Sequence, residues 1–472
     1  MTVIGDENKW AEAIFGQAKL GDARRTARLV RMATDLAASP DLSLDAACLG
    51  NEAAAEGAHR FVRNDAIAPE AIAEAGYEAT ARLAEQTDGL LLALEDTTSV
   101  GFSHSVIDEL GDIGGGQKYL RGWMVHSVLL AEAESKAPLG LLEQNRWKRD
   151  PNNSGKAKRR KKRPYPDKES YKWEHASRRV SQRVSQQVSD RLVSVCDRES
   201  DVFEYLAYKM STPGHFVVRN SWDRSVKNRE QTRLWACAKA APVQGTRKVV
   251  LTQRGGKYGR SARVATVEIS SCELTLRAPS RPKGWKLQPL DVRVVYVRET
   301  TPVEGKKPME WFLFTDLETT TFEQVERVVE FYEARWLIED FHKGWKSGTR
   351  LEQRRQRFAQ NLEKLAVITA FIAVRLLQIR SLAACAPETC CSEVFSRTEW
   401  QVLWLGAETA PPPDEPPTIE WAWRALAKLG GWRDTQGTGR VGWLLMWRGW
   451  ARLEQRVDGF ELALRFHQDA EM

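Results

Sequence analysis

The chain has 472 residues, of which 42% are hydrophobic and 28% are charged, and its formal net charge at pH 7 is +7. This length predicts about two to four domains, and the mild basic excess permits nucleic-acid binding without requiring it. The seven cysteines include no Cys-x-x-Cys pair, which argues against a zinc site and a disulfide framework. The apolar stretch 365–379 is short for a membrane span and carries Arg375, and the N-terminus lacks a signal pattern, so we expect a cytoplasmic protein with no membrane segment.

Residues 1–70 are predicted to form a small helical module. Arg24, Arg28 and Arg31 recur at helical spacing with Arg25 beside them, which places a basic stripe on one helix. Such a stripe either follows a phosphate backbone or is a solvated surface, and the spacing alone does not separate the two.

Two apolar runs of strand length, 90–94 (followed by Glu95) and 192–196, are predicted to end at acids, Asp96 and Asp197. In open α/β sheets, ligands bind beyond the carboxyl ends of the strands. Paired carboxylates there suit divalent cations, although an aspartate at a strand end is also a common turn residue. Between them, seven of the eight residues in Lys156–Arg163 are basic, which predicts a loop that serves as a DNA arm or is simply solvated.

Residues 220–315 change to alternating apolar and polar positions, which predicts a mostly antiparallel sheet. The expected strands are 247–254, 263–270, 273–277, 292–299 and 311–316.

One amphipathic helix is predicted over 321–348. Its polar flank carries Tyr332, Arg335, Glu339, His342 and Lys346. An acid beside cations and a phenol suits metal binding next to phosphate binding, whereas the common alternative is a charged surface.

The proline-rich stretch 411–417 is expected to separate this core from a C-terminal helical region. Apolar residues recur there at helical spacing: Trp443, Trp447, Trp450, Leu453, then Phe460 and Leu464. They predict a packing stripe.

The order Asp96, Asp197 and Glu339, with the Tyr-Arg-Glu-Lys spacing of the last helix, resembles the DDE transposases of bacterial insertion sequences. The resemblance covers most of the chain. Further similar segments are 20–30, 92–99, 121–130, 194–201, 216–219, 361–365, 371–378 and 421–432.

This resemblance implies an α/β fold: an RNase H-like mixed-sheet catalytic core over 71–380, with 220–315 as an inserted antiparallel β subdomain. It also implies an N-terminal helical DNA-binding domain over 1–70 and a C-terminal helical dimerisation domain over 381–472. The implied partners are double-stranded DNA, both transposon ends and target, and a second copy of the chain in a homodimer.

The implied chemistry is cut-and-paste transposition in which Asp96, Asp197 and Glu339 hold two Mg²⁺ ions, with Mn²⁺ as substitute. Trp311 is expected to stack on a flipped base, and His342 either to assist there or to be structural. The expected DNA contacts are Arg24, Arg25, Arg28, Arg31, Arg219, Trp311, Tyr332, Arg335, His342, Lys343, Lys346, Arg350, Arg354 and Arg355. The alternatives are an RNase H-like nuclease and a DNA-binding inhibitor with a dead site, and the presence of all three acids argues against the inhibitor.

Overall fold

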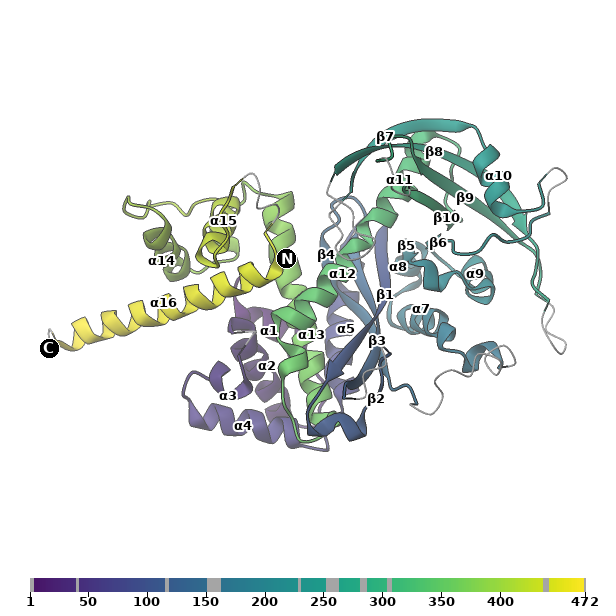
Figure 1. Ribbon diagram of the computed structural model, residues 1–472. Coiled ribbons are helices and arrows are strands. Elements are labelled where there is room, and N and C mark those ends of the chain that lie inside the picture. Colours follow the sequence, from purple (N-terminus) through teal and green to yellow (C-terminus); the bar gives the residue numbers. More distant parts are fainter. Residues whose placement is uncertain are drawn as a thin grey trace.

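The computed structural model describes residues 4–39, 42–114, 119–150, 163–227, 231–251, 263–280, 287–303, 308–435 and 441–470. It is a mixed α/β protein with one ten-stranded sheet, helices on both sheet faces and helical regions at both chain ends (Figure 1). The strands are β1 Leu91–Phe102, β2 Gly111–Asp112, β3 Arg121–Glu132, β4 Pro138–Trp147, β5 Leu192–Cys196, β6 His215–Arg219, β7 Val243–Leu251, β8 Arg263–Leu276, β9 Leu290–Glu299 and β10 Glu310–Thr315. The helices before β5 are α1 Glu7–Phe15, α2 Ala23–Ala38, α3 Leu44–Ala47, α4 Glu52–Arg63, α5 Pro69–Gln86, α7 Lys172–Arg183 and α8 Gln186–Asp190. The later helices are α9 Phe203–Met210, α10 Leu234–Ala240, α11 Phe322–Ala334, α12 Trp336–Lys343, α13 Ala359–Cys385, α14 Arg397–Ala407, α15 Ile419–Leu429 and α16 Trp443–Ala470.

The sheet is built around β1. On one side β1 pairs antiparallel with β3, which pairs antiparallel with β4; on the other side β1 pairs parallel with β5, and β5 pairs parallel with β6. Three antiparallel strands followed by two parallel ones are consistent with an RNase H-like core.

The strands of 220–315 continue this sheet. β10 pairs antiparallel with β6, and β9, β8 and β7 follow as an antiparallel extension. Strands expected separately at 263–270 and 273–277 form the single strand β8. The region is therefore antiparallel as predicted, and hydrogen bonding joins it to the core sheet.

Strand β1 is longer than predicted. Leu92 and Leu94 pack in one core cluster and Leu91 and Ala93 in another, because alternate side chains face opposite sides of a strand. Asp96 lies inside β1 rather than at its end, because pairing with β3 continues to Phe102. The expectation of a strand ending before Asp96 was wrong.

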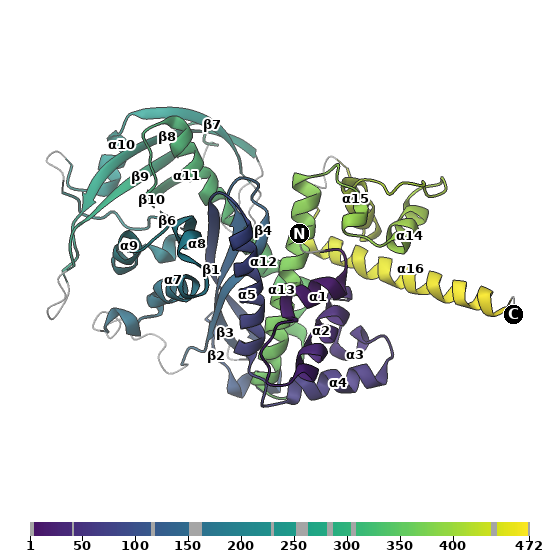
Figure 2. The same ribbon diagram turned by 180° about the vertical axis from the view of Figure 1, so that it is seen from behind.

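Helix α13 runs through the middle of the molecule, with the sheet on one side and both terminal helical regions on the other (Figures 1 and 2). The helix extends beyond the apolar stretch 365–379 at both ends. Among the described residues it is the one helix that is long and apolar enough to cross a membrane. Most of its apolar segment is, however, buried inside the protein. Its buried cations hold the N-terminal helices, since Arg375 donates to the Ile4 carbonyl at 2.7 Å and Lys364 to the Val62 carbonyl at 2.9 Å. The N-terminal helices therefore share their core with α13.

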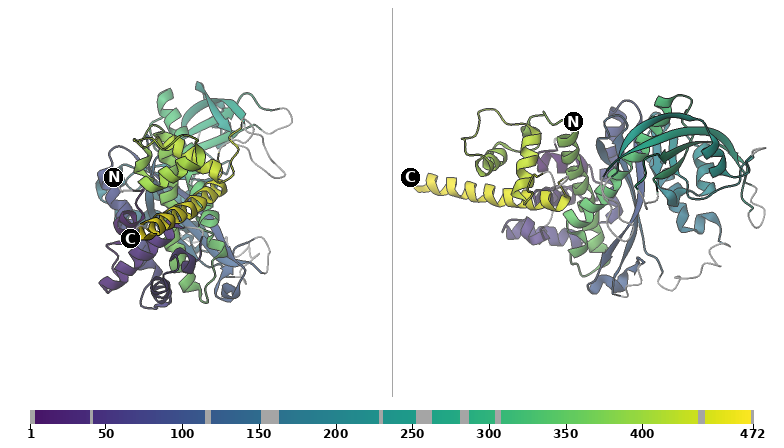
Figure 3. Two further views of the ribbon diagram at one scale, coloured as in Figure 1. Left: turned by 90° about the vertical axis from the view of Figure 1, so that its left-hand side faces the viewer. Right: turned by 45° about the horizontal axis from the view of Figure 1, so that its top comes forward.

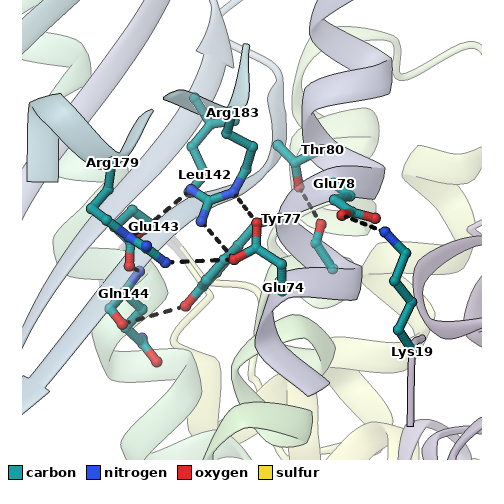
Figure 4. Close-up of polar contacts among 11 residues, drawn as sticks. Lys19, Glu74, Tyr77, Glu78, Thr80, Leu142, Glu143, Gln144, Arg179 and Arg183 are labelled. Carbon is teal, nitrogen blue, oxygen red and sulfur yellow. Dashed lines mark hydrogen bonds and ion pairs between the residues drawn. The ribbon is translucent and has the colours of Figure 1, made fainter. Parts of the chain in front are cut away.

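A buried ion-pair cluster joins α5, α7 and β4 (Figure 4). The Arg183 guanidinium contacts Glu74 at 2.8 Å and Glu143 at 3.1 Å, and Arg183 Nη1 also donates to the Leu142 carbonyl at 2.6 Å. Burial would lower the pKa of Arg183, but hydrogen bonding to Glu74 and the charge of Glu143 raise it overall. This cluster fixes the helices that cover β4.

The C-terminal region comprises α14, α15 and α16, and the prolines of 411–417 lie between α14 and α15 rather than before the region. Trp450 and Leu453 on the first half of α16 are buried in this chain, and Trp450 stacks on Phe395 at 5.3 Å. The second half of α16 projects away from the body (Figure 3) and exposes apolar side chains. These are Phe460, Leu462, Leu464 and Phe466. The side chains of Trp443 and Trp447, and the basic run up to residue 162, lie outside the described residues.

Candidate active site

Asp96, Asp197 and Glu339 lie on three elements: the middle of β1, the turn after β5, and α12. The last parallel pair between β1 and β5 is Glu95 with Cys196, so Asp96 and Asp197 are the next residues on neighbouring strands. Glu339 lies on α12, which packs against β1. The charges of Asp197 and Glu339 both raise the pKa of Asp96, which indicates that the three acids interact.

The predicted helix 321–348 is broken into α11, α12 and a π-helical turn, Gly344–Gly348. A capping box of Thr321 and Gln324 starts α11. Arg335 sits at the junction, where its backbone N–H bonds the Tyr332 carbonyl at 3.2 Å in place of the usual helical partner. The break places the Arg335 side chain over the acids.

The Arg335 guanidinium joins two of the three carboxylates. Its Nη2 lies 2.6 Å from Glu339 Oε1 and its Nη1 lies 3.5 Å from Asp96 Oδ2. Burial raises the pKa of Asp96 to about 6 against the lowering effect of Arg335. Burial also raises the pKa of Asp197. The site therefore holds costly buried acids that one internal cation partly neutralises.

The oxygen donors of these acids fit hard divalent cations chemically. Arg335 pairs with two of them, and in the described part of the chain no group of three or more His, Cys, Asp or Glu side chains is arranged to hold a metal ion. Arg335 would have to move before the carboxylates could close around one.

The remaining members of the Tyr-Arg-Glu-Lys set, Tyr332 and Lys346, contact β6 and β1 respectively. The Tyr332 hydroxyl accepts a hydrogen bond from Arg219 Nη1 at 3.2 Å, and the Tyr332 ring meets Trp311 edge to face at 5.0 Å. Lys346 Nζ donates to Thr98 Oγ1 at 2.9 Å, two residues beyond Asp96 on β1. The structure thus brings these predicted residues together around the acids.

Two predicted DNA contacts, His342 and Arg354, are buried in the structure. His342 is buried against Ser127 at 3.2 Å, and burial followed by the charge of Lys346 lowers its pKa to about 3, which fits a neutral structural histidine. Arg354 is only 8% exposed and donates to the Thr349 carbonyl at 3.1 Å, so it does not lie on an open phosphate track as expected. Lys343, Arg350 and Arg355 are exposed.

Two residues beside the site were not anticipated. Glu95, next to Asp96, is 1% exposed and lies 3.3 Å from His126. Because a buried acid needs a polar partner, its position beside an apolar strand segment could have predicted such a contact. Asp201 is 4% exposed and accepts bonds from the backbone N–H groups of Ser221 and Trp222. It ties the loop after Asp197 to the loop after β6.

The four arginines of the predicted N-terminal stripe lie on α2. Arg24 and Arg31 are exposed and pair with Asp22 and Asp35, whereas Arg25 Nη1 donates to the Leu20 carbonyl at 2.9 Å. Arg28 lies against Gly57 on α4. Residues 7–67, which span these helices, match the family model described as transposase DNA-binding. This match supports a transposase that takes DNA as its partner.

Proposed function

We propose that this protein is a DDE-type transposase that cuts and joins DNA by a metal-dependent cut-and-paste route. The observation that carries the proposal is that Arg335 joins Asp96 to Glu339, while Asp197 follows the strand that pairs with β1 just before Asp96. The N-terminal match to a transposase DNA-binding model supports the same reading.

Asp96, Asp197 and Glu339 would hold two Mg²⁺ ions, or Mn²⁺ in their place. Bound there, the ions supply activation of water or of a 3′-hydroxyl and stabilisation of the leaving oxygen in an in-line displacement. The reaction would proceed through nicking, hairpin formation, hairpin opening and strand transfer.

The residues around the acids would hold the DNA. Arg335 is suited to bidentate phosphate contact, and its buried Nε has no hydrogen-bond partner among the described residues. Lys346 would act as a point charge on a neighbouring phosphate, and Tyr332 as a hydroxyl donor. The ring of Trp311, partly buried against the core, would stack on a flipped base, which contributes about 1–3 kcal/mol.

The arrangement of the whole chain fits this role. The helices of 7–67 would bind the element ends, and the exposed apolar half of α16 would pair two copies in a synaptic homodimer. We expect the protein to work in the bacterial cytoplasm at the nucleoid.

The test uses a plasmid that carries the coding sequence with its natural flanking DNA, incubated with the full chain and Mg²⁺ or Mn²⁺. Nicks, hairpin ends and an excised fragment are expected on denaturing gels, and Asp96→Asn, Asp197→Asn and Glu339→Gln should abolish all three. Asp340→Asn is the matched control, because Asp340 neighbours Glu339 but pairs with Arg380 at 2.9 Å. Activity retained by any of the three site variants would rule out the mechanism.

An RNase H-like nuclease is the second candidate, since it would use the same acids. It would cut DNA without forming hairpin ends or joining the excised fragment to a target. The gel products therefore separate the two functions.

A further inference from the structure

A hollow of about 570 Å³ lies between α14, α15 and α16, away from the acids. Its apolar lining residues include Leu403, Trp421, Ala425 and Leu429. Its charged lining residues are four cations and one acid: Arg424, Lys428, Arg452, Arg456 and Glu408. The lining is therefore strongly basic.

Two glycines allow the helices that carry these cations, α15 and α16, to approach each other. An added Cβ at Gly449 of α16 would lie 2.0 Å from the Leu426 carbonyl of α15, and one at Gly430 would lie 1.8 Å from the Leu445 carbonyl of α16. The two helices therefore approach closely, and cations of both helices line the same hollow. A cluster of like charges is unfavourable unless anions accompany it.

The anions within the chain balance only the α15 side. Asp434 lies 2.9 Å from Arg424 and 3.3 Å from Lys428. Neither Arg452 nor Arg456 has a carboxylate within ion-pair distance in the described ranges of the chain.

The α16 arginines are held toward the hollow. Arg452 Nη1 donates to the Leu429 carbonyl at 2.6 Å, which leaves its other donors available. Arg456 Nη1 lies 2.2 Å from the position that a Cβ on residue 406 would take, so the glycine at 406 makes room for it. With the exposed Arg448, they form a row at i, i+4 and i+8, about 6 Å apart along the helix axis.

We propose that this row, Arg448, Arg452 and Arg456, together with the hollow beside it, binds the phosphate backbone of duplex DNA. The proposal rests on the proposed function, because a transposase must hold DNA beyond the ends that its N-terminal helices bind. An evenly spaced row of planar guanidinium groups along a straight helix suits successive phosphates. The contact is sequence-independent, because it involves no base edges.

The experiment measures fluorescence anisotropy of a labelled 30-base-pair random-sequence duplex with the full chain between about 50 and 300 mM salt. Arg452→Gln/Arg456→Gln should weaken binding about 10- to 50-fold at 100 mM salt and reduce the slope of log affinity against log salt by about two. Arg298→Gln/Arg327→Gln is the matched control, since it removes the same charge where Glu268 and Glu134 already pair with it; its slope should stay unchanged. Arg452→Lys/Arg456→Lys should restore most of the slope, which separates loss of contact from misfolding.

An unchanged slope in the double Gln variant, or equal losses in the control, would overturn the proposal. A poly-glutamate peptide that binds wild type more tightly than the duplex, and loses that binding in the double Gln variant, would assign the surface to an acidic protein instead. If wild type cleaves DNA but the double Gln variant keeps the wild-type salt slope, only the proposed DNA-binding surface is refuted. No binding of any duplex by wild type refutes the proposed function as well.

Discussion

Burial of the Asp96 carboxylate destabilises the folded protein, so replacing Asp96 with a neutral residue should raise the free energy of unfolding when no metal is added. The side chain is 19% exposed and its pKa is raised to about 6 from a model-compound value of 3.8, mainly by burial. Because the folded state binds the proton more tightly than the unfolded state, stability from this group falls as pH rises from about 4 to about 6. Above about pH 6 the buried carboxylate is ionised, and it lowers the free energy of unfolding by a constant amount.

The magnitude follows from the pKa difference. A shift of about 2.2 units at 1.36 kcal/mol per unit gives about 3 kcal/mol at pH 8. Asp96→Asn keeps the shape and an acceptor for Arg335 but carries no charge. We therefore expect the variant to match wild type near pH 4 and to exceed its free energy of unfolding by up to about 3 kcal/mol at pH 8.

Thermal and urea unfolding of both proteins from pH 4 to pH 8, with and without 10 mM Mg²⁺, measures this difference. Mg²⁺ at 10 mM competes with Arg335 for the carboxylates, so without DNA it should stabilise wild type only slightly through binding to the folded state, and it should leave Asp96→Asn unchanged. A variant that is less stable than wild type at pH 8 without metal, or a difference that does not grow between pH 4 and pH 6, would refute the reasoning. Equal stabilisation of both proteins by Mg²⁺ would show that Asp96 is not required for metal binding.

Three further outcomes follow from particular contacts. Arg183→Met should lower the free energy of unfolding by about 1–3 kcal/mol, because it leaves the 7% exposed Glu143 with only the longer 3.4 Å ion pair to Arg179. Lys19→Met at an 86% exposed side chain should change it by less than about 0.5 kcal/mol, and equal urea midpoints for the two variants would contradict this. Gly76→Ala should cost about 1–3 kcal/mol, since its Cβ would lie 2.2 Å from an aromatic ring of α13, and a melting temperature equal to wild type would show that the ring yields freely. Lys346→Met should leave folding intact and reduce the salt slope of duplex binding by about one, so an unchanged slope by anisotropy would remove Lys346 from the phosphate contacts.

Local sequence patterns predicted much of the fold. The apolar run before Asp197 is β5, and the alternation of 220–315 is an antiparallel set of strands. Period and propensity are local properties, so they locate elements well. They cannot show that β10 pairs with β6, which joins the inserted strands to the core sheet, because that pairing depends on residues about a hundred positions apart.

The same distinction applies to the site. The spacing of Tyr332, Arg335, Glu339 and Lys346 predicted a shared face on one helix. The structure divides that helix at Arg335 and adds a π-helical turn after α12. The spacing shows neither of these breaks nor the contact of Arg335 with Asp96, which lies on a distant strand. Burial of Arg354 also depends on packing, since four nearby arginines look equivalent in the sequence.

Arg335 connects the stability of the site with its proposed chemistry. The Arg335 guanidinium offsets part of the cost of burying Asp96 and Glu339. In the proposed complex the same guanidinium would pair with a phosphate, and it cannot engage two carboxylates and a phosphate with the same donors. A phosphate that draws Arg335 away would leave the acids without their cation at the moment when divalent ions become their best partners. The site would then take up metal most readily when DNA is present, which restricts a reactive nuclease centre to its substrate.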